Sequence, residues 1–346
     1  MTRREVLLGR RHGPPRPEAS TAAIAIAGLE KTFASPLTRK PRPVLRGLDL
    51  EVRAGEVCGF LGLNGAGKTT TIRCLVGLLR PTAGSVSILG GSPRDPAVRR
   101  RLGYLPENPS FNDHLTPVEA LDLAGRLCDL PGALRRRRIA DLLAALRLEP
   151  AARTPIRKLS KGNVQRVGIA QAVLHEPELL ILDEPMSGLD PLGRRDLRDL
   201  IDRLRAAGRT VFFSSHIVPD VEALCDRVAI LDRGRLVRVG RIEELTTVRL
   251  NAVEILVRNV PGELLARLLG PEDRIEERGS TTRLLVHDPE RVDRLLVRAI
   301  QVGGRIEGLE RRRERLEEYF VRVAKAREPE PAPERAPEPA PGGARS

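Results

Sequence analysis

The sequence predicts an α/β fold built on a mainly parallel sheet, followed by a smaller α+β module. Three observations support this prediction. Short apolar strand patterns alternate with helix patterns through about two thirds of the 346 residues. A glycine-rich loop at residues 62–69 joins an apolar strand to a helix. After about residue 250 the order becomes strand, helix, two strands, helix and strand, as in a split β-α-β module.

The amino-terminal part begins with a segment that has little to bury. Residues 1–22 are basic and rich in proline and glycine, so we expect a disordered arm. From Ala23 the stretches AIAIAGLEKTF and VLRGLDLEVRAGEV follow strand patterns, and the polar segment 34–43 is expected to be a loop. A short apolar strand at 58–62 then leads into the glycine-rich loop and a helix that begins near Lys68.

Strand and helix patterns continue to alternate through the rest of the chain. The parallel part is expected to contain strands at 179–182, 210–214 and 227–232, and helices at 116–149 (divided at 130–132), 164–174, 191–207 and 219–225. The later module is expected to contain strands at 253–260, 274–277, 283–287 and 305–309, and helices at 262–269, 290–300 and 313–326. Its order fits a ferredoxin-like fold. The Pro/Glu-rich tail 328–346 is expected to be disordered.

Composition excludes several classes of protein. No run of about 18 apolar residues occurs, so the chain is not expected to span a membrane. No apolar segment follows the basic amino terminus, so we expect no signal peptide and a cytoplasmic location. The cysteines lack CxxC or metal-ligand spacing and are expected to be buried, reduced thiols: Cys58, Cys74, Cys128 and Cys225.

The net charge of +13 suggests nucleic acid or an anionic membrane surface as a partner. Two features weaken this interpretation. Almost all of the basic residues are arginine, which fits a compositional bias, and aromatic residues make up only 2% of the chain. Single-strand binding proteins rely on aromatic stacking. The arginine run 135–138 is expected to be a solvated helix face, with anionic lipid head groups as the alternative contact.

The strongest motif satisfies the pattern G-x-x-x-x-G-K-(S/T) between a strand and a helix: Gly62-Leu63-Asn64-Gly65-Ala66-Gly67-Lys68-Thr69. Glycines let the backbone amides of such a loop turn toward phosphate oxygens, and the helix N-terminus adds positive potential. Lys68 is predicted to reach the β- and γ-phosphates, and the Thr69 hydroxyl to bind Mg²⁺.

A second motif follows the apolar strand at 179–182, which ends in Asp183 and Glu184. Asp183 is predicted to hold Mg²⁺, and Glu184 to polarise a water for attack on the γ-phosphate. A solvated strand end is the ordinary interpretation of a lone acidic pair. Because the phosphate loop is present in the same chain, we favour the functional interpretation.

The segment between these motifs distinguishes one class of phosphate-loop protein from another. Leu159-Ser160-Lys161-Gly162-Asn163 precedes a helix, and Ser160 by itself is an N-cap. This segment resembles the LSGGQ signature of ABC transporter nucleotide-binding subunits. Lys161 and Asn163 stand where the commonest form has Gly and Gln, and such variants resemble the ABC-2 exporter branch more than importers.

Further positions extend the resemblance in the family's motif order. Ser187-Gly188-Leu189-Asp190 resembles the D-loop, and His216 resembles the switch histidine. Glu107 stands where the Q-loop glutamine belongs, and its carboxylate is still able to approach Mg²⁺. Phe33 lies where the family places its adenine-stacking aromatic, with a core position as the other interpretation.

The resemblance implies a P-loop NTPase fold of the ABC cassette type in residues 23–250. This fold has a RecA-like core, an antiparallel β part and a helical subdomain at about 108–175. An accessory domain of the ferredoxin-like kind is expected at 251–327, where Leu316-Glu317-Glu318-Tyr319-Phe320 resembles the final helix of such domains on ABC-2 exporter subunits. The implied cofactors are ATP and Mg²⁺.

The residues implied for ATP binding are Phe33, Asn64, Gly65, Ala66, Gly67, Lys68, Thr69 and Thr70, and those implied for the metal are Thr69, Asp183 and Glu107. Glu184 and His216 are the implied catalytic residues. The signature residues are implied to act in trans: Ser160, Lys161, Gly162 and Asn163.

One phosphate loop and one signature imply a head-to-tail homodimer in which each subunit completes the other's site. Because a transporter motor needs a membrane partner, the resemblance implies separate integral-membrane permease subunits of the ABC-2 type. The chain would then lie on the inner face of the cell membrane, and no nucleic acid is expected. Two alternatives remain: an ABC ATPase acting on the ribosome or nucleic acid, and a non-catalytic regulator.

Overall fold

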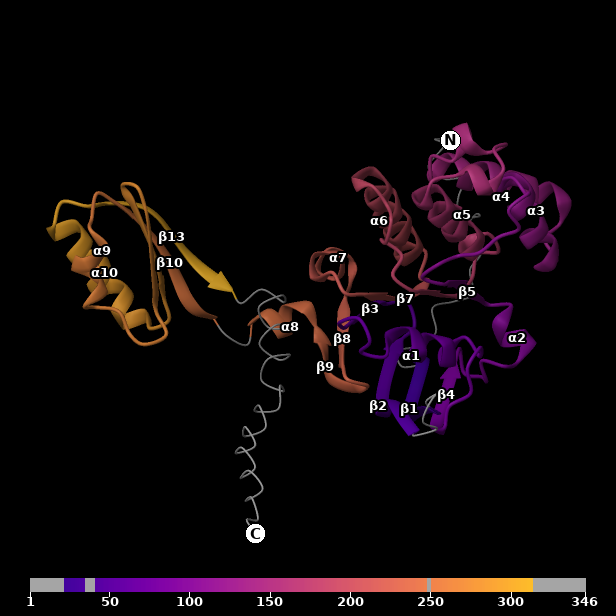
Figure 1. The fold of residues 1–346 in the computed structure, drawn as a ribbon, viewed down its shortest axis with the longest axis horizontal. Helices are drawn as coiled ribbons and strands as arrows, with labels where there is room; N and C mark the ends of the chain where they lie inside the picture. Colours follow the sequence, from indigo (N-terminus) through magenta and orange to yellow (C-terminus); the bar gives the residue numbers. More distant parts are fainter. Residues whose placement is uncertain (1–21, 35–40, 248–249, 314–346) are drawn as a thin grey trace, which may run out of the picture.

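The computed structural model describes residues 22–34, 41–247 and 250–313 (Figure 1). Within these residues the strands form three sheets, a central one of six strands and two smaller ones of three and four strands. Almost all of the predicted arm, the whole Pro/Glu tail and the segment 316–320 lie outside the described residues.

The central sheet has the order β5-β6-β7-β3-β8-β9. Its five neighbouring strands from β5 to β8 are parallel, and β9 pairs antiparallel with β8 at the edge. This arrangement confirms the predicted mainly parallel sheet. The strands are β3 (Val57–Leu61), β5 (Leu102–Leu105), β6 (Leu179–Leu182), β7 (Thr210–Ser215), β8 (Arg227–Asp232) and β9 (Arg235–Arg241).

Successive residues of these strands enter two different hydrophobic cores. Phe60 and Phe212 lie in one core, with ring centroids 5.3 Å apart. Leu61 and Phe213 lie in the other core, on the opposite face. Because both faces are buried, the strand sequences are continuous apolar runs rather than alternating ones.

Each face of the central sheet is covered by different elements (Figure 1). One face bears five helices: α3 (Pro117–Leu127), α4 (Gly132–Ala145), α5 (Lys161–Val173), α6 (Pro191–Ala206) and α7 (Val218–Leu224). The other bears α1 (Lys68–Leu75), α2 (Pro96–Arg99) and an antiparallel sheet of β1 (Ala22–Ala34), β2 (Pro41–Arg53) and β4 (Ala83–Ile88). Short 3₁₀ helices at Glu149–Ala151 and Ile156–Lys158 precede α5, and α8 (Ile242–Thr247) follows β9.

Two sequence-based boundaries were wrong. The predicted loop at 34–43 is partly strand, because Ala34 pairs with Pro41 and Thr32 pairs with Pro43 across β1 and β2. The prolines are tolerated there because β2 is an edge strand of its sheet. The helix predicted at 164–174 begins earlier, at Lys161, because the Ser160 side chain caps its first turn.

The arginine run 135–138 is only partly a solvated helix face. Arg135 forms an ion pair with Asp122 of α3, and Arg138 forms one with Glu176, 2.6 Å away. The exposed fractions of these two arginine side chains are only 13% and 18%. Arg135 and Arg138 therefore connect α4 to neighbouring segments through ion pairs.

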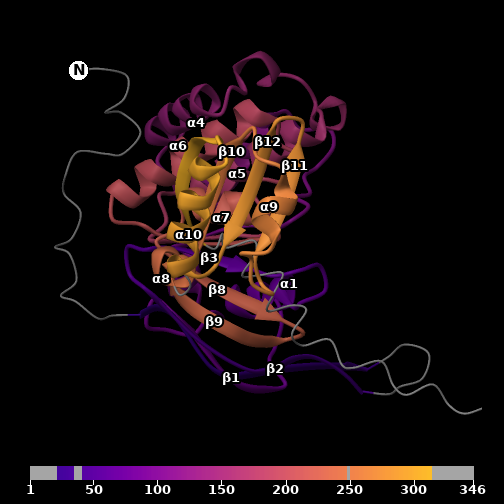
Figure 2. The same cartoon turned by 90° about the vertical axis from the view of Figure 1, so that its left-hand side faces the viewer.

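The carboxyl-terminal module has a four-stranded antiparallel sheet of order β11-β12-β10-β13. With two helices, its elements are β10 (Leu250–Arg258), α9 (Gly262–Ala266), β11 (Arg274–Arg278), β12 (Thr281–Val286), α10 (Pro289–Gln301) and β13 (Arg305–Arg313). Figure 2 shows the module from the side on which α9 and α10 lie. The strand order and alternation confirm the predicted ferredoxin-like topology. Arg313 still belongs to β13, and the rest of the helix predicted at 313–326 lies outside the described residues.

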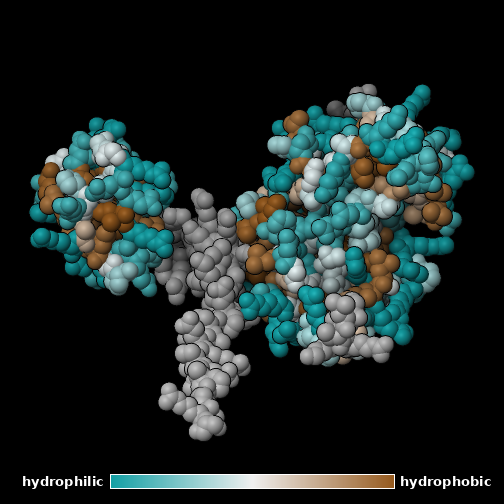
Figure 3. All heavy atoms as spheres, in the orientation of Figure 1, coloured by the Kyte–Doolittle hydropathy of each residue, from teal (hydrophilic) through white to brown (hydrophobic). Residues whose placement is uncertain are grey.

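The surface view of Figure 3 shows a largely hydrophilic face with small, separate apolar areas. In the described ranges, every helix is too short or too polar to cross a bilayer. This finding agrees with the absence of a long apolar run in the sequence.

A buried carboxylate organises one end of the module. The Asp273 side chain has no exposed surface and accepts hydrogen bonds from the backbone N–H groups of Gly270 and His287, at 2.7 and 2.8 Å. It also pairs with Arg291 Nη1 at 3.2 Å. Burial works to raise the pKa of Asp273, but these donors outweigh it and hold the pKa below its ordinary value.

We predict that Asp273→Ala lowers the free energy of unfolding of this module by about 3 kcal/mol at pH 7. The change leaves two buried N–H groups unpaired and takes from Arg291 one of its two carboxylate partners, Asp288 being the other. The native carboxylate has a depressed pKa, so its contribution is complete above the unfolded pKa of about 4 and is lost as the pH falls through the folded value. Hydrogen exchange of α10 in the full chain, under denaturant titration at pH 7 and pH 3, measures both effects. The exposed Asp293 of α10 supplies the control Asp293→Ala, and an equal loss in both variants would contradict the prediction.

Candidate functional site

The glycine-rich loop lies between β3 and α1, as predicted. Gly65 and Gly67 have φ angles of +82° and +112°, which other residues rarely adopt. A Cβ atom on Gly67 would also lie 2.8 Å from Leu45 Cδ2. The loop therefore needs glycine both for its backbone turns and for its packing against β2.

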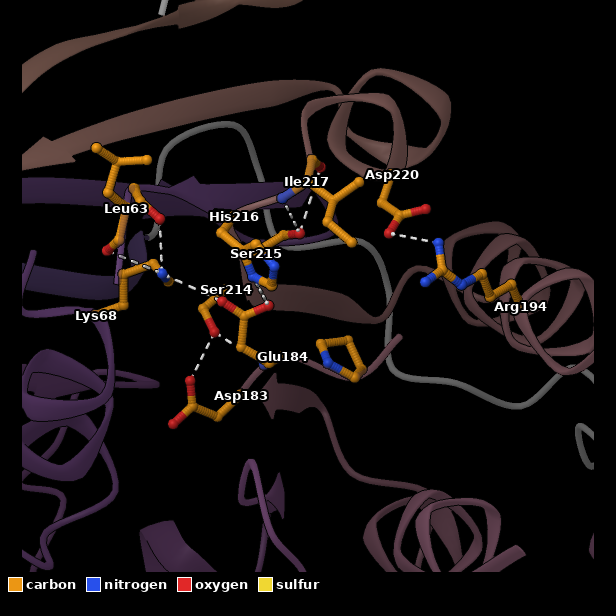
Figure 4. Close-up of polar contacts among 12 residues, drawn as sticks. Leu63, Lys68, Asp183, Glu184, Arg194, Ser214, Ser215, His216, Ile217 and Asp220 are labelled. Carbon is orange, nitrogen blue, oxygen red and sulfur yellow. Dashed lines mark hydrogen bonds and ion pairs between the residues drawn. The ribbon is translucent and has the colours of Figure 1, made fainter. Parts of the chain in front are cut away.

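Lys68 is held inside this loop, with only 6% of its side chain exposed. Its ammonium donates to the carbonyl of Gly62 at 2.6 Å and to that of Leu63 at 3.3 Å. The same nitrogen lies 3.2 Å from Glu184 Oε1 (Figure 4). The structure thus brings the first two predicted motifs into direct contact.

Asp183 follows β6 and is fully buried. Its Oδ1 accepts a hydrogen bond from Ser214 Oγ at 2.6 Å, while its Oδ2 has no protein hydrogen-bond partner in the described part of the chain. Burial raises the pKa of Asp183, and the charges of Glu107 and Glu184 raise it further, against the lowering effect of the Ser214 and Thr69 hydroxyls. A cation at Oδ2 would relieve this accumulation of negative charge.

The side chains around Asp183 suit a Mg²⁺ ion that is also bound by phosphates better than a metal bound by protein ligands alone. Thr69 and Glu107 both lie close enough to Asp183 to change its pKa. Across residues 22–34, 41–247 and 250–313, no three His, Cys, Asp or Glu side chains cluster in a way that could hold a metal. Mg²⁺ in phosphoryl-transfer sites takes only one or two carboxylates, with phosphate and water as its other ligands.

Glu184 has an unusual backbone and two charged neighbours. Its φ angle is +48°, in the left-handed region that residues other than glycine seldom occupy. Its Oε2 lies 2.9 Å from His216 Nδ1, and its Oε1 faces Lys68. The His216 side chain, 44% exposed, is reachable from solvent. Lys68, Glu184 and His216 therefore form one line of contacts, in which the pairing of Lys68 with Glu184 was not predicted from the sequence.

Ser214 is a site residue that the sequence analysis missed. It falls at the end of the strand expected at 210–214, where a fully buried hydroxyl requires hydrogen-bond partners. Its oxygen donates to Asp183 and accepts the backbone N–H of Glu184 at 2.9 Å. Ser214 therefore contacts both acidic residues that follow β6.

The signature segment lies at the start of α5. Ser160 is exposed, and its hydroxyl accepts the N–H of Asn163 at 3.2 Å. A Cβ on Gly162 would lie 2.8 Å from the Gly188 carbonyl, so the signature packs against the D-loop of the same chain. In the described residues, no hydrogen bond or ion pair joins 160–163 to the phosphate loop. Figure 1 places α5 and α1 on opposite faces of the sheet.

Arg166 of α5 ties the signature helix to the D-loop. It donates to Asp190 Oδ1 and to the Leu146 carbonyl after α4, each at 2.8 Å. Asp190 also caps α6 by accepting the N–H of Gly193, and both bonds lower the pKa of Asp190. Arg166 belongs to no motif that the sequence indicates, because its partners are distant along the chain.

The remaining predicted positions are accessible to different degrees. Phe33 lies on β1 with 40% of its surface exposed and Lys31 Nζ 5.1 Å from its ring centre, so it is not a core residue. Glu107 and Asn64 are exposed, Thr69 and Thr70 are half-buried, and Ala66 is buried. Lys161, like Ser160, faces solvent.

Comparison with known proteins shows which family this chain belongs to. Residues 45–187 match the family model described as ABC transporter. An uncharacterised ABC transporter ATP-binding protein of Nostoc sp. is 41% identical, with 87% of this chain and 89% of the relative covered. A Nod factor export ATP-binding protein I of Ralstonia nicotianae is 35% identical over 80% of this chain and 86% of its own length. The bacitracin transport ATP-binding protein BcrA of Bacillus licheniformis is 42% identical over 55% of this chain and 62% of its own.

Solved structures give the same result. The ATP-binding subunit of an ABC transporter matches with a TM-score of 0.60 and 35% identity, covering 66% of this chain and 92% of that one. A dimeric ATP-binding cassette in a post-hydrolysis state, bound to ADP and Pi, matches with a TM-score of 0.59 and 25% identity, covering 63% and 98%. With the phosphate loop, the two acidic residues and the histidine assembled at one edge of the sheet, the chain belongs to the ABC transporter family as an ATP-binding, ATP-hydrolysing subunit.

Proposed function

We propose that this chain is the motor subunit of an ABC-2 type exporter, in which ATP closes a homodimer and so drives a separate membrane permease. The observation that supports it best is the line of contacts from Lys68 through Glu184 to His216. Beside it lies Oδ2 of Asp183, which has no hydrogen-bond partner among the residues that the structure describes. The Nod factor export and bacitracin transport relatives support the exporter assignment.

Each side chain has a task in this proposal. The loop amides and Lys68 hold the β- and γ-phosphates, and the exposed ring of Phe33 stacks on the adenine. Thr69, Asp183 and Glu107 would hold Mg²⁺, which would neutralise charge that develops on the phosphates. Lys68 leaves Glu184 for the γ-phosphate, which frees Oε1 of Glu184 to take a proton from the attacking water. His216, already 2.9 Å from Oε2, keeps the carboxylate in position.

The dimer supplies what one chain lacks. Ser160 and Lys161 are exposed and make no polar contact with the phosphate loop of their own chain in the described residues. In a head-to-tail homodimer they would cover the nucleotide of the partner subunit. Because Arg166 links the signature helix to Asp190, the signature and the D-loop would approach that nucleotide as one unit.

The helical subdomain at about 108–175 offers the surface for the permease. Leu123 and Leu127, four residues apart on α3, are 50% and 77% exposed. Residues four apart share one face of a helix, so the two side chains form an apolar stripe. The segment 108–121 begins directly after Glu107 and leads into α3, so it would connect the metal site to the docking surface. The chain would therefore lie on the inner face of the cell membrane.

We predict that Glu184→Gln reduces ATP turnover by about a hundredfold or more, because it removes the general base. ATP binding is kept, so the variant accumulates as an ATP-bound dimer. Phosphate release and light scattering with and without ATP measure the two effects. Glu149→Gln, at an exposed position, is the control. Turnover close to that of the wild type in Glu184→Gln would exclude Glu184 as the base.

We predict that the Glu184→Gln chain, purified with ATP from gently solubilised native cells, retains a stoichiometric protein with several membrane-spanning helices. Adding Leu127→Glu to the same chain is expected to release that protein, because a charge on the apolar stripe is costly to bury. ATP binding by the double variant is the control for folding. Recovery of ribosomal proteins or nucleic acid in place of a membrane protein would favour the alternative in which the ATPase acts on the ribosome.

A further inference from the structure

We propose that Ser214 is a positioning residue for the two acidic residues after β6. It orients Asp183 toward the metal and Glu184 toward the attacking water. The inference deepens the proposed function and rests on it for the roles of Asp183 and Glu184. It is carried by three adjoining observations: the two hydrogen bonds of Ser214, the free oxygen of Asp183 and the backbone of Glu184.

The Ser214 hydroxyl is held in a single orientation. It lies on β7, has no exposed surface, and carries only one proton. That proton is donated to Asp183 Oδ1 at 2.6 Å, so a lone pair of the same oxygen receives the Glu184 N–H at 2.9 Å (Figure 4). One side chain therefore fixes a carboxylate and a peptide group just beyond the end of the neighbouring strand, β6.

The bond to Asp183 determines which carboxylate oxygen is available to the metal. Oδ1 is occupied by Ser214, whereas Oδ2 is buried and has no hydrogen-bond partner in the described residues. The backbone of Asp183 is also fixed, because its N–H donates to the Leu105 carbonyl of β5 at 2.9 Å. Strands on both sides of β6 thus hold Asp183, and Oδ2 is the oxygen left free for Mg²⁺.

The bond to Glu184 holds a strained backbone. A φ of +48° is unfavourable for a glutamate and persists only where the surroundings determine it. By accepting the Glu184 N–H, Ser214 fixes the orientation of that peptide. The Glu184 side chain then lies between Lys68 and His216, at 3.2 and 2.9 Å. Without the hydroxyl, this peptide would lose the hydrogen bond that β7 gives to its N–H.

The next residue provides a matched control. Ser215 is also buried, but its hydroxyl accepts the Ile217 N–H at 2.9 Å and donates to the Ile217 carbonyl at 3.3 Å. It has no hydrogen bond to Asp183 or Glu184. Ser215→Ala therefore removes a buried hydroxyl from the same strand end without touching the acidic pair.

The first experiment uses the full chain without nucleotide or metal and measures hydrogen exchange at the Glu184 amide. We expect exchange to be about tenfold faster or more in Ser214→Ala, because the amide loses its acceptor. Ser214→Thr, which keeps a hydroxyl, and Ser215→Ala are expected to exchange as the wild type does. Equal exchange in Ser214→Ala and the wild type would overturn the proposal.

The second experiment measures ATP binding as a function of Mg²⁺ concentration. Without Mg²⁺, Ser214→Ala is expected to bind ATP as the wild type does, because the phosphate loop is unchanged. The Mg²⁺ concentration for half-maximal enhancement is expected to rise about tenfold, with a parallel fall in kcat, and Ser214→Thr is expected to restore both. Ser215→Ala is expected to leave the Mg²⁺ dependence unchanged.

Two outcomes separate this inference from the proposed function. If the wild type binds MgATP and Ser214→Ala shows the same Mg²⁺ dependence, Ser214 has only a packing role. In that case the positioning role is excluded and the proposed function still stands. If the wild type binds no MgATP, the proposed function fails, while the exchange measurement still tests whether Ser214 holds Glu184. Thermal unfolding verifies folding. Ser214→Cys, similar in size with a weaker donor, replaces the alanine variant in both experiments if that variant does not fold.

Discussion

The parallel register of the central sheet is the constraint on which the site depends. β3, β6 and β7 are neighbours or near neighbours and run in the same direction, so their carboxyl ends meet at one edge. Lys68 follows the first of these strands, and Asp183 and Glu184 follow the second. Ser214 lies near the end of the third, and His216 follows it. Segments more than a hundred residues apart are thereby brought within hydrogen-bond distance. Ligand sites in open α/β sheets generally form at this edge.

Burial of both faces of the sheet stabilises the strands whose ends carry the site. Two separate apolar cores cover the faces, so the strands themselves need no polar partners beyond one another. The polar and strained groups are concentrated where the strands end, at Lys68, Asp183 and the left-handed backbone of Glu184. A rigid sheet is able to hold such groups in unfavourable surroundings, because relaxing any one of them would disturb the packed strands beneath.

A small number of hydrogen bonds and close contacts connect the helical subdomain to the site. Arg166 connects the signature helix to the D-loop and to the end of α4, and Gly162 allows the signature to lie directly against Gly188. Arg135 and Arg138 fasten α4 to α3 and to the segment after α5. These arginines contribute to the high positive net charge, yet they stabilise the packing of the helices against one another.

The local features of this protein follow from short stretches of its sequence. The phosphate loop, the strand ending in two acidic residues and the order of the ferredoxin-like module were all predictable, because each depends on residues close together in the chain. Tertiary structure alone decided the ion pair of Lys68 with Glu184, the role of Ser214, the tie made by Arg166 and the pairing of the prolines at 41–43 in β2. These contacts join residues far apart in sequence, and only the register of neighbouring strands and helices determines which side chains meet.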